Sequence, residues 1–227
     1  MIIGNGLLAR SFALEFSTDP DIVVFASGVS NSSESRASEF ARERALLDRA
    51  LDQRRLLVYF GSCGVATAEQ DPSPYMQHKQ EMEARVLDSG HGLVLRLPQV
   101  VGSTSNPHTL INFMRDRILS GQSFTVWSKA QRNLIDVDDI AAIGGRLIRG
   151  HRIAPKPISV AAPQSLTVIE IVGLMERILG RKAHYVVEDR GAPLRIDADE
   201  ACAAAADLGI DMGPGYAERI LRKYYAP

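Results

Sequence analysis

Tyr75 and Lys79 stand four residues apart in the segment SPYMQHK. On a helix this spacing places both side chains on one face. A lysine ammonium beside a phenol stabilises the phenolate and lowers its pKa, and such a phenol can exchange a proton with a hydroxyl or ketone oxygen. Ser62 ends the preceding apolar run and could hydrogen-bond the same oxygen. We predict that these three residues form a catalytic group; the simpler interpretation is a half-buried Tyr75 and a solvated Lys79.

Two local elements must position this group. Residues 56–61 are apolar and end in small residues, a pattern typical of a buried strand. Ser73 and Pro74 are typical of a helix start, with serine as the N-cap and proline in the first helical position. We expect that helix to run to about residue 89 and to end at Gly90.

The N-terminus carries a glycine pattern. An apolar start leads into GNGLLA at residues 4–9, which is G-x-G-x-x-A, and a helix is expected over residues 7–16. Glycines permit a tight strand-to-helix turn and let a pyrophosphate approach the backbone amides at the helix N-terminus. The pattern favours dinucleotide binding, and the alternative is a structural turn in an α/β domain.

The matching ribose-binding acid is absent. The dinucleotide fingerprint expects Asp or Glu about 20 residues after the glycines. That position falls near Ala26, in a predicted strand over residues 21–29 that has no acid at its end. Either Ser27, Ser30 or Asn31 holds the adenosine ribose, or the adenosine end is poorly held.

Alternating strands and helices continue through the chain and predict an α/β fold. Helix 34–51 is amphipathic, with Phe40, Ala45, Leu46 and Leu47 on its apolar side and Arg36, Arg42, Glu43 and Arg44 on its solvent side. The remaining expected strands are 92–101, 122–127, 134–137, 157–161 and 184–187, and the remaining helices are 108–120, 138–148, 166–179, 197–208 and 216–225. Ser165 is the expected N-cap of helix 166–179. Residues 66–72 and 103–107 are expected loops.

The sequence pattern changes near Ala162 and Pro163, which suggests that the chain has two parts. Residues 1–162 form the expected cofactor-binding and catalytic core, with residues 102–133 contributing to the substrate cleft. Residues 163–227 form a C-terminal annex that covers the substrate, because ligands lie beyond the carboxyl ends of parallel strands.

Composition excludes several classes of function. The net charge of −1 gives no indication of a nucleic-acid or membrane partner, and no apolar run approaches a membrane span. Two distant cysteines and the lack of a signal peptide fit a cytoplasmic protein. No metal is expected, because the histidines at 78, 91, 108, 151 and 184 are scattered. His78 is expected on a helix surface. Asp138 and Asp139 are expected to stabilise a helix N-terminus rather than to bind a cation.

The order of motifs resembles the extended short-chain dehydrogenase/reductase family, the nucleotide-sugar epimerases and reductases. The matching segments are GNGLLA, FASGVSNSSES, FGSCGV, SPYMQHK, RLPQVVG and QRNLIDVDDIA. The resemblance implies that Ser62, Tyr75 and Lys79 are catalytic. It implies cofactor contacts from Gly4, Asn5, Gly6, Leu7, Leu8, Ser27, Gly28, Lys79 and Pro98. It implies substrate contacts from Gln99, Asn106 and Arg132. Gln99 stands where the family often has Asn, and the simpler interpretation of Arg132 is a surface arginine.

The chain departs from the family in one respect. FASGVSNSSES resembles the segment after the fourth strand of the family fold, yet here it follows the first helix directly. We therefore predict a shortened Rossmann-like parallel sheet with helices on both faces, lacking the second and third strands that build the adenosine pocket.

Two functional hypotheses follow from the resemblance. The first is an NAD- or NADP-dependent epimerase or keto-reductase that acts on a nucleotide-linked sugar. Cys63 and Gly64 follow Ser62 where the family's 4,6-dehydratases have an acidic pair, which argues against dehydration. The second is a degenerate, non-catalytic member that binds a sugar nucleotide or a partner subunit. Because the family often dimerises, the resemblance also suggests a homodimer.

Overall fold

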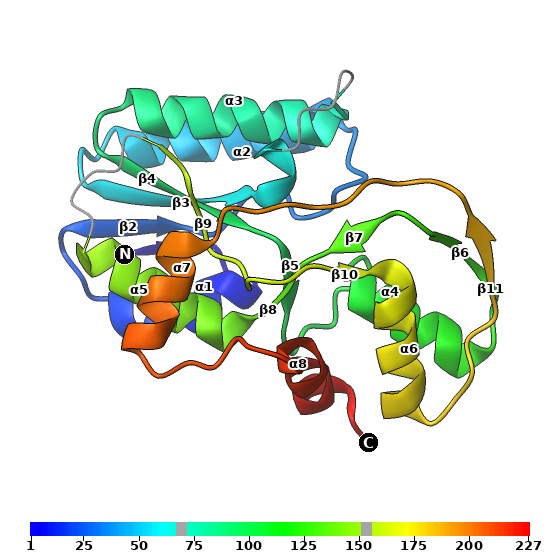
Figure 1. The fold of residues 1–227 in the computed structure, drawn as a ribbon. Coiled ribbons are helices and arrows are strands. Elements are labelled where there is room, and N and C mark those ends of the chain that lie inside the picture. Colours follow the sequence, from blue (N-terminus) through cyan, green and yellow to red (C-terminus); the bar gives the residue numbers. More distant parts are fainter. Residues whose placement is uncertain (67–71, 151–155) are drawn as a thin grey trace.

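A five-stranded parallel sheet forms the centre of the computed structural model, which describes residues 1–66, 72–150 and 156–227 (Figure 1). Most of the predicted loop 66–72, and His151, lie outside the described residues. The strand order is β1-β2-β3-β4-β9. The strands are β1 (Ile2–Ile3), β2 (Ile22–Phe25), β3 (Leu56–Ser62), β4 (Gly92–Leu97) and β9 (Ile158–Ser159). The predicted α/β class with a parallel sheet is confirmed.

Helices cover both faces of this sheet. In Figure 1, α2 (Ala37–Leu51) and α3 (Pro74–Asp88) lie above it, and α1 (Leu7–Phe16) and α5 (Val137–Gly150) lie below it. Alternate residues of β2 enter different apolar clusters, Val23 on the α2–α3 side and Val24 on the α1–α5 side. Strands buried on both faces explain the continuous apolar runs of the sequence.

The sheet ends at β1. Ile2 and Ile3 pair in parallel with Val24 and Phe25 of β2, and within the described residues no strand pairs with the other side of β1. In this sheet the first strand is therefore an edge strand, as expected if the strands that build an adenosine pocket are missing.

Pro98 divides the predicted strand 92–101 into two strands, a correction to the sequence prediction. β4 ends at Leu97 in the main sheet, and β5 (Gln99–Val101) pairs in parallel with β8 (Leu134–Asp136). Proline lacks the N–H group that continues a ladder, so the chain changes sheets at this residue.

Segments on either side of Pro163 pair with each other. β6 (Phe124–Trp127) is parallel to β11 (Tyr185–Glu188), and β7 (Gln131–Arg132) is antiparallel to β10 (Leu166–Thr167). The helices of this region are α4 (Leu110–Ser120), α6 (Val168–Leu179), α7 (Asp199–Asp207) and α8 (Tyr216–Tyr225). α6 packs against α4 and α8, while α7 packs against α5 of the core.

The predicted N-cap of α6 was wrong. Thr167, not Ser165, caps this helix: its side chain accepts a hydrogen bond from Glu170 N, and the Glu170 carboxylate accepts one from the Thr167 backbone N–H. This reciprocal pair is a capping box, and its T-x-x-E signature is present in the sequence.

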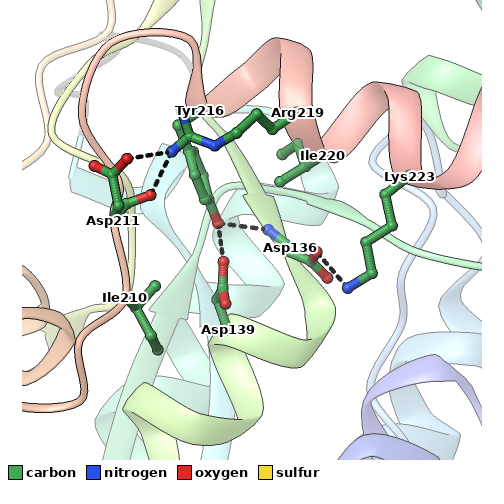
Figure 2. Close-up of a pocket in the computed structure, with 8 residues that line it drawn as sticks. All are labelled: Asp136, Asp139, Ile210, Asp211, Tyr216, Arg219, Ile220 and Lys223. Atoms are coloured by element: carbon green, nitrogen blue, oxygen red, sulfur yellow. Dashed lines mark hydrogen bonds and ion pairs between the residues drawn. The ribbon is translucent and has the colours of Figure 1, made fainter.

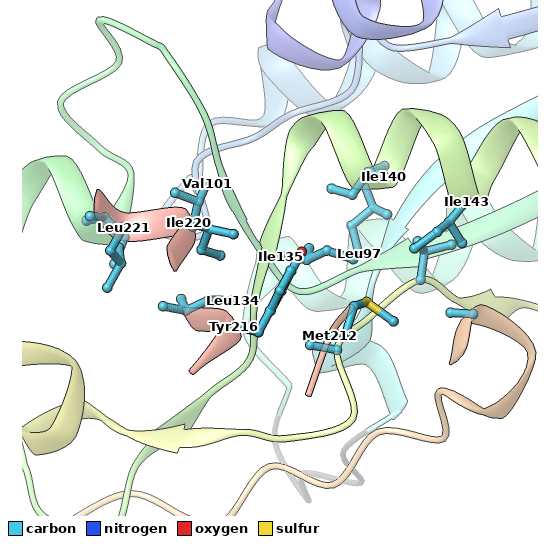
Figure 3. Close-up of a cluster of buried hydrophobic side chains, with 14 of the residues drawn as sticks. Leu97, Val101, Leu134, Ile135, Ile140, Ile143, Met212, Tyr216, Ile220 and Leu221 are labelled. Atoms are coloured by element: carbon cyan, nitrogen blue, oxygen red, sulfur yellow. The ribbon is translucent and has the colours of Figure 1, made fainter. Parts of the chain in front are cut away.

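Helix α8 is held to the core by both apolar and polar contacts. Tyr216, Ile220 and Leu221 join a buried cluster with Leu134 and Ile135 (Figure 3). Beside it lies a cavity of about 360 Å³, lined by the residues of Figure 2. These contacts fix the last helix against the start of α5.

Polar contacts at this junction satisfy the buried end of β8. The Tyr216 hydroxyl donates to Asp139 at 2.6 Å and accepts from Asp136 N at 3.0 Å. Lys223 Nζ lies 2.8 Å from Asp136 and 2.7 Å from Asp138. The two acids predicted to stabilise a helix N-terminus do lie in the first turn of α5.

Tyr216→Phe is expected to lower the free energy of unfolding by about 1–3 kcal/mol, because a buried N–H and a carboxylate both lose a partner. Tyr185→Phe is the matched control, since within the described residues its hydroxyl makes no hydrogen bond; it should cost less than about 0.5 kcal/mol. Urea unfolding of both variants measures the difference, and equal costs would contradict the assignment.

Candidate active site

Ser62 and Tyr75 lie together at the carboxyl end of β3. Ser62 is the last residue of that strand, and a 3-10 turn (Cys63–Ala66) carries the chain away from the sheet. The Ser62 hydroxyl accepts from Gly64 N at 3.2 Å, and it lies close enough to the Tyr75 hydroxyl to act on the pKa of that phenol. Tyr75 is buried in the first turn of α3, whose N-cap is Ser73, as the sequence predicted.

Lys79 is buried and faces α2 rather than solvent. Its Nζ lies 3.1 Å from Glu43 Oε1 and 3.0 Å from the Tyr59 hydroxyl. The same atom lies 5.9 Å from the centroid of the Tyr75 ring. The helix does bring Lys79 to the face that carries Tyr75, but its ammonium is committed to the Glu43 carboxylate.

Glu43 is fully buried, so its predicted place on the solvent side of its helix was wrong. Its carboxylate accepts four hydrogen bonds: from Val29 N at 2.6 Å, Tyr59 Oη at 2.7 Å, His78 Nε2 at 3.0 Å and Lys79 Nζ at 3.1 Å. The physical reason for the error is that these donors satisfy the charge that would otherwise exclude Glu43 from the interior.

His78 was also predicted on a helix surface and is buried instead. Its ring stacks on Phe40 with centroids 4.6 Å apart. Because an ionised carboxylate only accepts hydrogen bonds, Nε2 carries the hydrogen shared with Glu43. Its Nδ1 is buried and unpartnered within the described residues. His78 therefore fixes the Glu43 carboxylate from the α3 side.

The pKa of Tyr75 is raised to about 12, opposite in direction to the lowering expected from the Tyr75–Lys79 spacing. Burial is the largest cause, the Glu43 carboxylate adds to it, and Glu83 adds less. The hydrogen bond with Ser62 opposes the rise in pKa. The physical reasons for the error are the burial of the phenol and, after it, the Glu43 carboxylate, which neutralises the ammonium that was expected to stabilise the phenolate.

The Glu43–Lys79 pair shifts both of its members. Burial alone would raise the pKa of Glu43, but hydrogen bonds and the Lys79 charge outweigh it and lower that pKa to about 2. Burial lowers the pKa of Lys79, and Glu43 opposes this lowering. Glu43 is therefore ionised throughout the neutral range.

The glycine turn has two different glycines. Gly4 has φ +124°, and a side chain there would collide with the Ala26 carbonyl, so packing against β2 explains this glycine. Nothing described lies within 4 Å of a side chain built at Gly6. Gly6 caps α1 without a side-chain hydrogen bond, and the first turn of α1 has no acid. Asn5 beside it is exposed, and Leu7 and Leu8 are half-buried. The open space and free amides fit a phosphate.

Ser27 and Gly28 follow β2 beside this turn. Arg42 donates to the Ser27 carbonyl at 3.3 Å and to its hydroxyl at 3.4 Å. A side chain at Gly28 would approach Lys79 Nζ to 2.7 Å and Glu43 Oε1 to 2.9 Å. Gly28 is therefore required by the buried ion pair, which explains this glycine without a cofactor.

Strand register links Ser62 to the residues predicted to bind substrate. Ser62 pairs with Leu97, the last residue of the adjacent strand β4, so Pro98 follows directly after the partner of Ser62. Gln99 then pairs with Leu134, and its N–H donates to the Asn133 carbonyl at 3.0 Å. Gln99 and the segment before β8 are thus held at the Ser62 end of the sheet.

Arg132 is a partly buried cation without a carboxylate. Within the described residues its side chain donates to the Gln131 carbonyl and forms no ion pair, and burial lowers its pKa. Such a group is suited to an anionic ligand. By contrast, Asn106 lies in the loop before α4 and uses its side-chain oxygen to accept from His108 N. A cavity of about 220 Å³ lies nearby and is lined by Gln131, Asn133, Ser165 and Arg195, but not by Arg132 itself.

The described residues hold no group of three or more metal-ligating side chains. No helix within the described ranges is both long and apolar enough to traverse a bilayer.

The fold and site define a Rossmann-type α/β protein with serine, tyrosine and lysine around the carboxyl end of one strand. The sequence model of the NAD dependent epimerase/dehydratase family matches residues 7–160. The chain belongs to this family. No curated protein matches its sequence.

Three solved structures show the same fold. UDP-glucose 4-epimerase of Thermus thermophilus, in complex with NAD, is 17% identical with a TM-score of 0.68 and covers 96% of this chain and 80% of its own. UDP-glucose-4-epimerase of Stenotrophomonas maltophila, with bound NAD and formylated UDP-arabinopyranose, is 18% identical with a TM-score of 0.69; the shares are 98% and 82%. RMD from Pseudomonas aeruginosa, complexed with NADPH, is 19% identical with a TM-score of 0.67; the shares are 97% and 86%.

The low pKa of Glu43 predicts acid sensitivity. The unfolded state binds a proton at an ordinary pKa of 4.5 and the folded state only near 2, so Glu43 stabilises the fold fully above 4.5 and progressively less as pH falls toward 2. Glu43→Gln should cost about 3 kcal/mol at neutral pH and show a shallower loss of stability over this range. Urea unfolding at several pH values measures both slopes; equal slopes would refute the prediction.

Proposed function

We propose that this protein is an NAD- or NADP-dependent epimerase or keto-reductase acting on a nucleotide-linked sugar. Tyr75 exchanges a proton with the reacting hydroxyl or ketone oxygen, and Ser62 hydrogen-bonds the same oxygen. A bound nicotinamide supplies or accepts the hydride. Lys79 is the third member of the group and lies on the same face of α3 as Tyr75.

One observation carries this proposal: Ser62 and Tyr75 lie together at the same end of the sheet as Arg132, which has no carboxylate partner within the described residues. The pair supplies a hydroxyl donor and a phenol at one point. The register from Ser62 through Leu97 and Gln99 leads to the segment that contains Arg132. A substrate with an anionic end and a reacting oxygen matches both features.

The residues fit one half of a dinucleotide better than the other. The free amides of α1 and the open space at Gly6 suit the pyrophosphate, and Asn5, Leu7 and Leu8 line the same turn. Ser27 and Pro98 would contact the nicotinamide half. No acid stands at the end of β2 to hold the adenosine ribose. The cofactor is therefore held mainly through its pyrophosphate and nicotinamide half.

The substrate side would be built by Gln99, Asn106 and Arg132 together with the C-terminal segment 163–227. Arg132 would hold the diphosphate, and the cavity beside Gln131, Asn133 and Arg195 would accept the nucleotide or the sugar. These side chains come from residues before and after Pro163. The segment 102–133 and the annex would therefore both line the substrate site.

Tyr75→Phe is expected to reduce turnover of a UDP- or dTDP-linked sugar at least 100-fold, because general acid–base catalysis is lost. Binding of NADH or NADPH, followed by nicotinamide fluorescence, should stay within about twofold of the native value. Tyr185→Phe is the matched control and should retain turnover. Unchanged turnover by the Tyr75 variant would remove Tyr75 from the reaction.

A second candidate is a non-catalytic binder of sugar nucleotides. The commitment of Lys79 to Glu43 and the missing ribose acid favour it, since both reduce the groups available to a dinucleotide. The placement of Ser62 beside Tyr75 favours the enzyme. Tight UDP binding, with no binding of NADH or NADPH at millimolar concentration, would decide for the binder.

Arg132→Met tests the substrate side under either candidate. UDP affinity should fall about 10- to 100-fold, because a charge-assisted contact is lost. The unfolding free energy should not fall by more than about 0.5 kcal/mol, since the guanidinium loses no carboxylate partner. Arg181→Met, which removes a surface arginine bonded to a carbonyl, is the control. Unchanged UDP affinity, measured by calorimetry, would exclude Arg132 from the site.

A further inference from the structure

We propose that Glu43 is a positioning residue whose carboxylate holds the Lys79 ammonium against Tyr59, so that the resting centre carries Tyr75 as the neutral phenol and acts first as a proton donor. This inference rests on the proposed function for its catalytic meaning. Its physical content concerns residues of this chain alone.

The first support is geometric. Lys79 Nζ is held between Glu43 Oε1 at 3.1 Å and Tyr59 Oη at 3.0 Å, and Tyr59 also donates to the same carboxylate oxygen at 2.7 Å. The lysine contacts the ring face of Tyr75, 5.9 Å from its centroid. The ammonium is thus directed at a carboxylate that is ionised throughout the neutral range.

The second support is the number of donors on Glu43. Val29 N and His78 Nε2 bind Oε2, while Tyr59 and Lys79 bind Oε1. A buried carboxylate with four donors from the β2 loop, β3 and α3 is held rigidly as an anion. Lys79 therefore cannot exchange this partner for a phenolate without leaving Glu43 under-satisfied.

The third support is the charge balance of the buried centre. The charged and titratable side chains that face Tyr75 and Lys79 are Tyr59 on β3, His78 and Glu83 on α3, Arg96 on β4, and Glu43 and Arg42 on α2. Glu43 pairs with Lys79, and Glu83 pairs with Arg96 at 2.6 Å. When Tyr75 is neutral, the positive and negative charges of these two ion pairs cancel. A phenolate would add one uncompensated negative charge in a region shielded from water.

The consequence is a defined resting protonation state for the first step. A phenol is the form that donates a proton to a ketone, whereas oxidation of a hydroxyl needs the phenolate. In reduction, Tyr75 gives its proton to the carbonyl oxygen while a hydride from a reduced nicotinamide adds to the carbon. The Tyr75 O–H bond, one C–H bond of the reduced nicotinamide and the carbonyl π bond would break, while one O–H and one C–H bond would form on the substrate. The Tyr75 phenolate would then regain a proton from solvent. Glu43 thus sets a resting centre in which the first proton moves from Tyr75 to a carbonyl oxygen.

Glu43→Gln tests the inference by direct titration. Phenolate absorbance near 295 nm is followed against pH for a protein and for its Tyr75→Phe counterpart, and the difference isolates Tyr75 from the other five tyrosines. In the native protein no Tyr75 phenolate should form below pH 9. Glu43→Gln should lower the midpoint by at least one pH unit, a tenfold gain in phenolate at a given pH, because Tyr75 becomes the counter-ion of Lys79.

Matched variants separate this role from a structural one. Glu43→Asp keeps the charge and should keep the native midpoint. Glu81→Gln removes an exposed carboxylate of the same helix α3 and should leave it unchanged. A Tyr75 midpoint below pH 9 in the native protein, or an unchanged midpoint in folded Glu43→Gln, would overturn the proposal. Should Glu43→Gln not fold, the native and Glu43→Asp titrations still decide it.

The titration requires no substrate, cofactor or turnover. Loss of the proposed function would appear as absent catalysis with the native Tyr75 midpoint intact, whereas failure of the Glu43 role would appear as a shifted or insensitive midpoint. In an active preparation, Glu43→Gln should also move the pH profile of kcat/KM for alcohol oxidation to lower pH.

Discussion

The buried Glu43 carboxylate constrains the structure around the candidate active site. An ionised carboxylate inside a protein is tolerated only when its acceptor positions are filled. Here the donors come from the loop after β2, from β3 and from α3, while Glu43 itself lies on α2. Four segments must therefore keep their relative positions. The orientation of α3, and with it the position of Tyr75 beside Ser62, depends on this contact.

The constraint acts locally, which explains how the site tolerates a shortened sheet. β1 is the edge of the described sheet, and the four hydrogen bonds to Glu43 come from the loop after β2, from β3 and from α3, with none from β1. The substrate side is likewise held by pairing between β3, β4, β5 and β8. Neither set of contacts uses strands that would lie beyond β1. The contacts around Ser62 and Tyr75 are therefore complete without any strand beyond β1.

Sequence patterns predicted the elements whose signals are local. Ser73, Pro74 and Gly90 fixed the ends of α3 because capping depends on a few adjacent residues. Pro98 and the T-x-x-E pattern of Thr167 and Glu170 were also local signals, yet neither led to a correct prediction. The apolar run 92–101 favoured one continuous strand across Pro98, and Ser165 was predicted as the N-cap in place of Thr167.

The buried polar centre could not be predicted in the same way. Glu43, Leu47 and Ala50 follow helical periodicity and share the buried face of α2. Because a charged residue on a helix is usually solvated, the sequence nevertheless favoured a solvent-exposed Glu43. His78 was misplaced for the same reason. The partner of Lys79 lies 36 residues away, and only the packed helices show that its ammonium faces Glu43 instead of a phenolate. The spacing of Tyr75 and Lys79 established a shared face but not the charge that the face meets.

The buried face of α3 carries a second ion pair that completes this account. Tyr75, Lys79 and Glu83 follow one another at four-residue intervals, and Glu83 binds Arg96 of β4 over Gly61, where any side chain would collide with the Glu83 carboxylate. Moving α3 by one turn along the sheet would place Lys79 near the site of Glu83 and leave both Glu43 and Arg96 without their counter-ions. The two ion pairs therefore specify a single register for the helix. That register is the one that brings Tyr75 to Ser62, so the polar interior sets both the geometry of the candidate catalytic pair and the neutral state of its phenol.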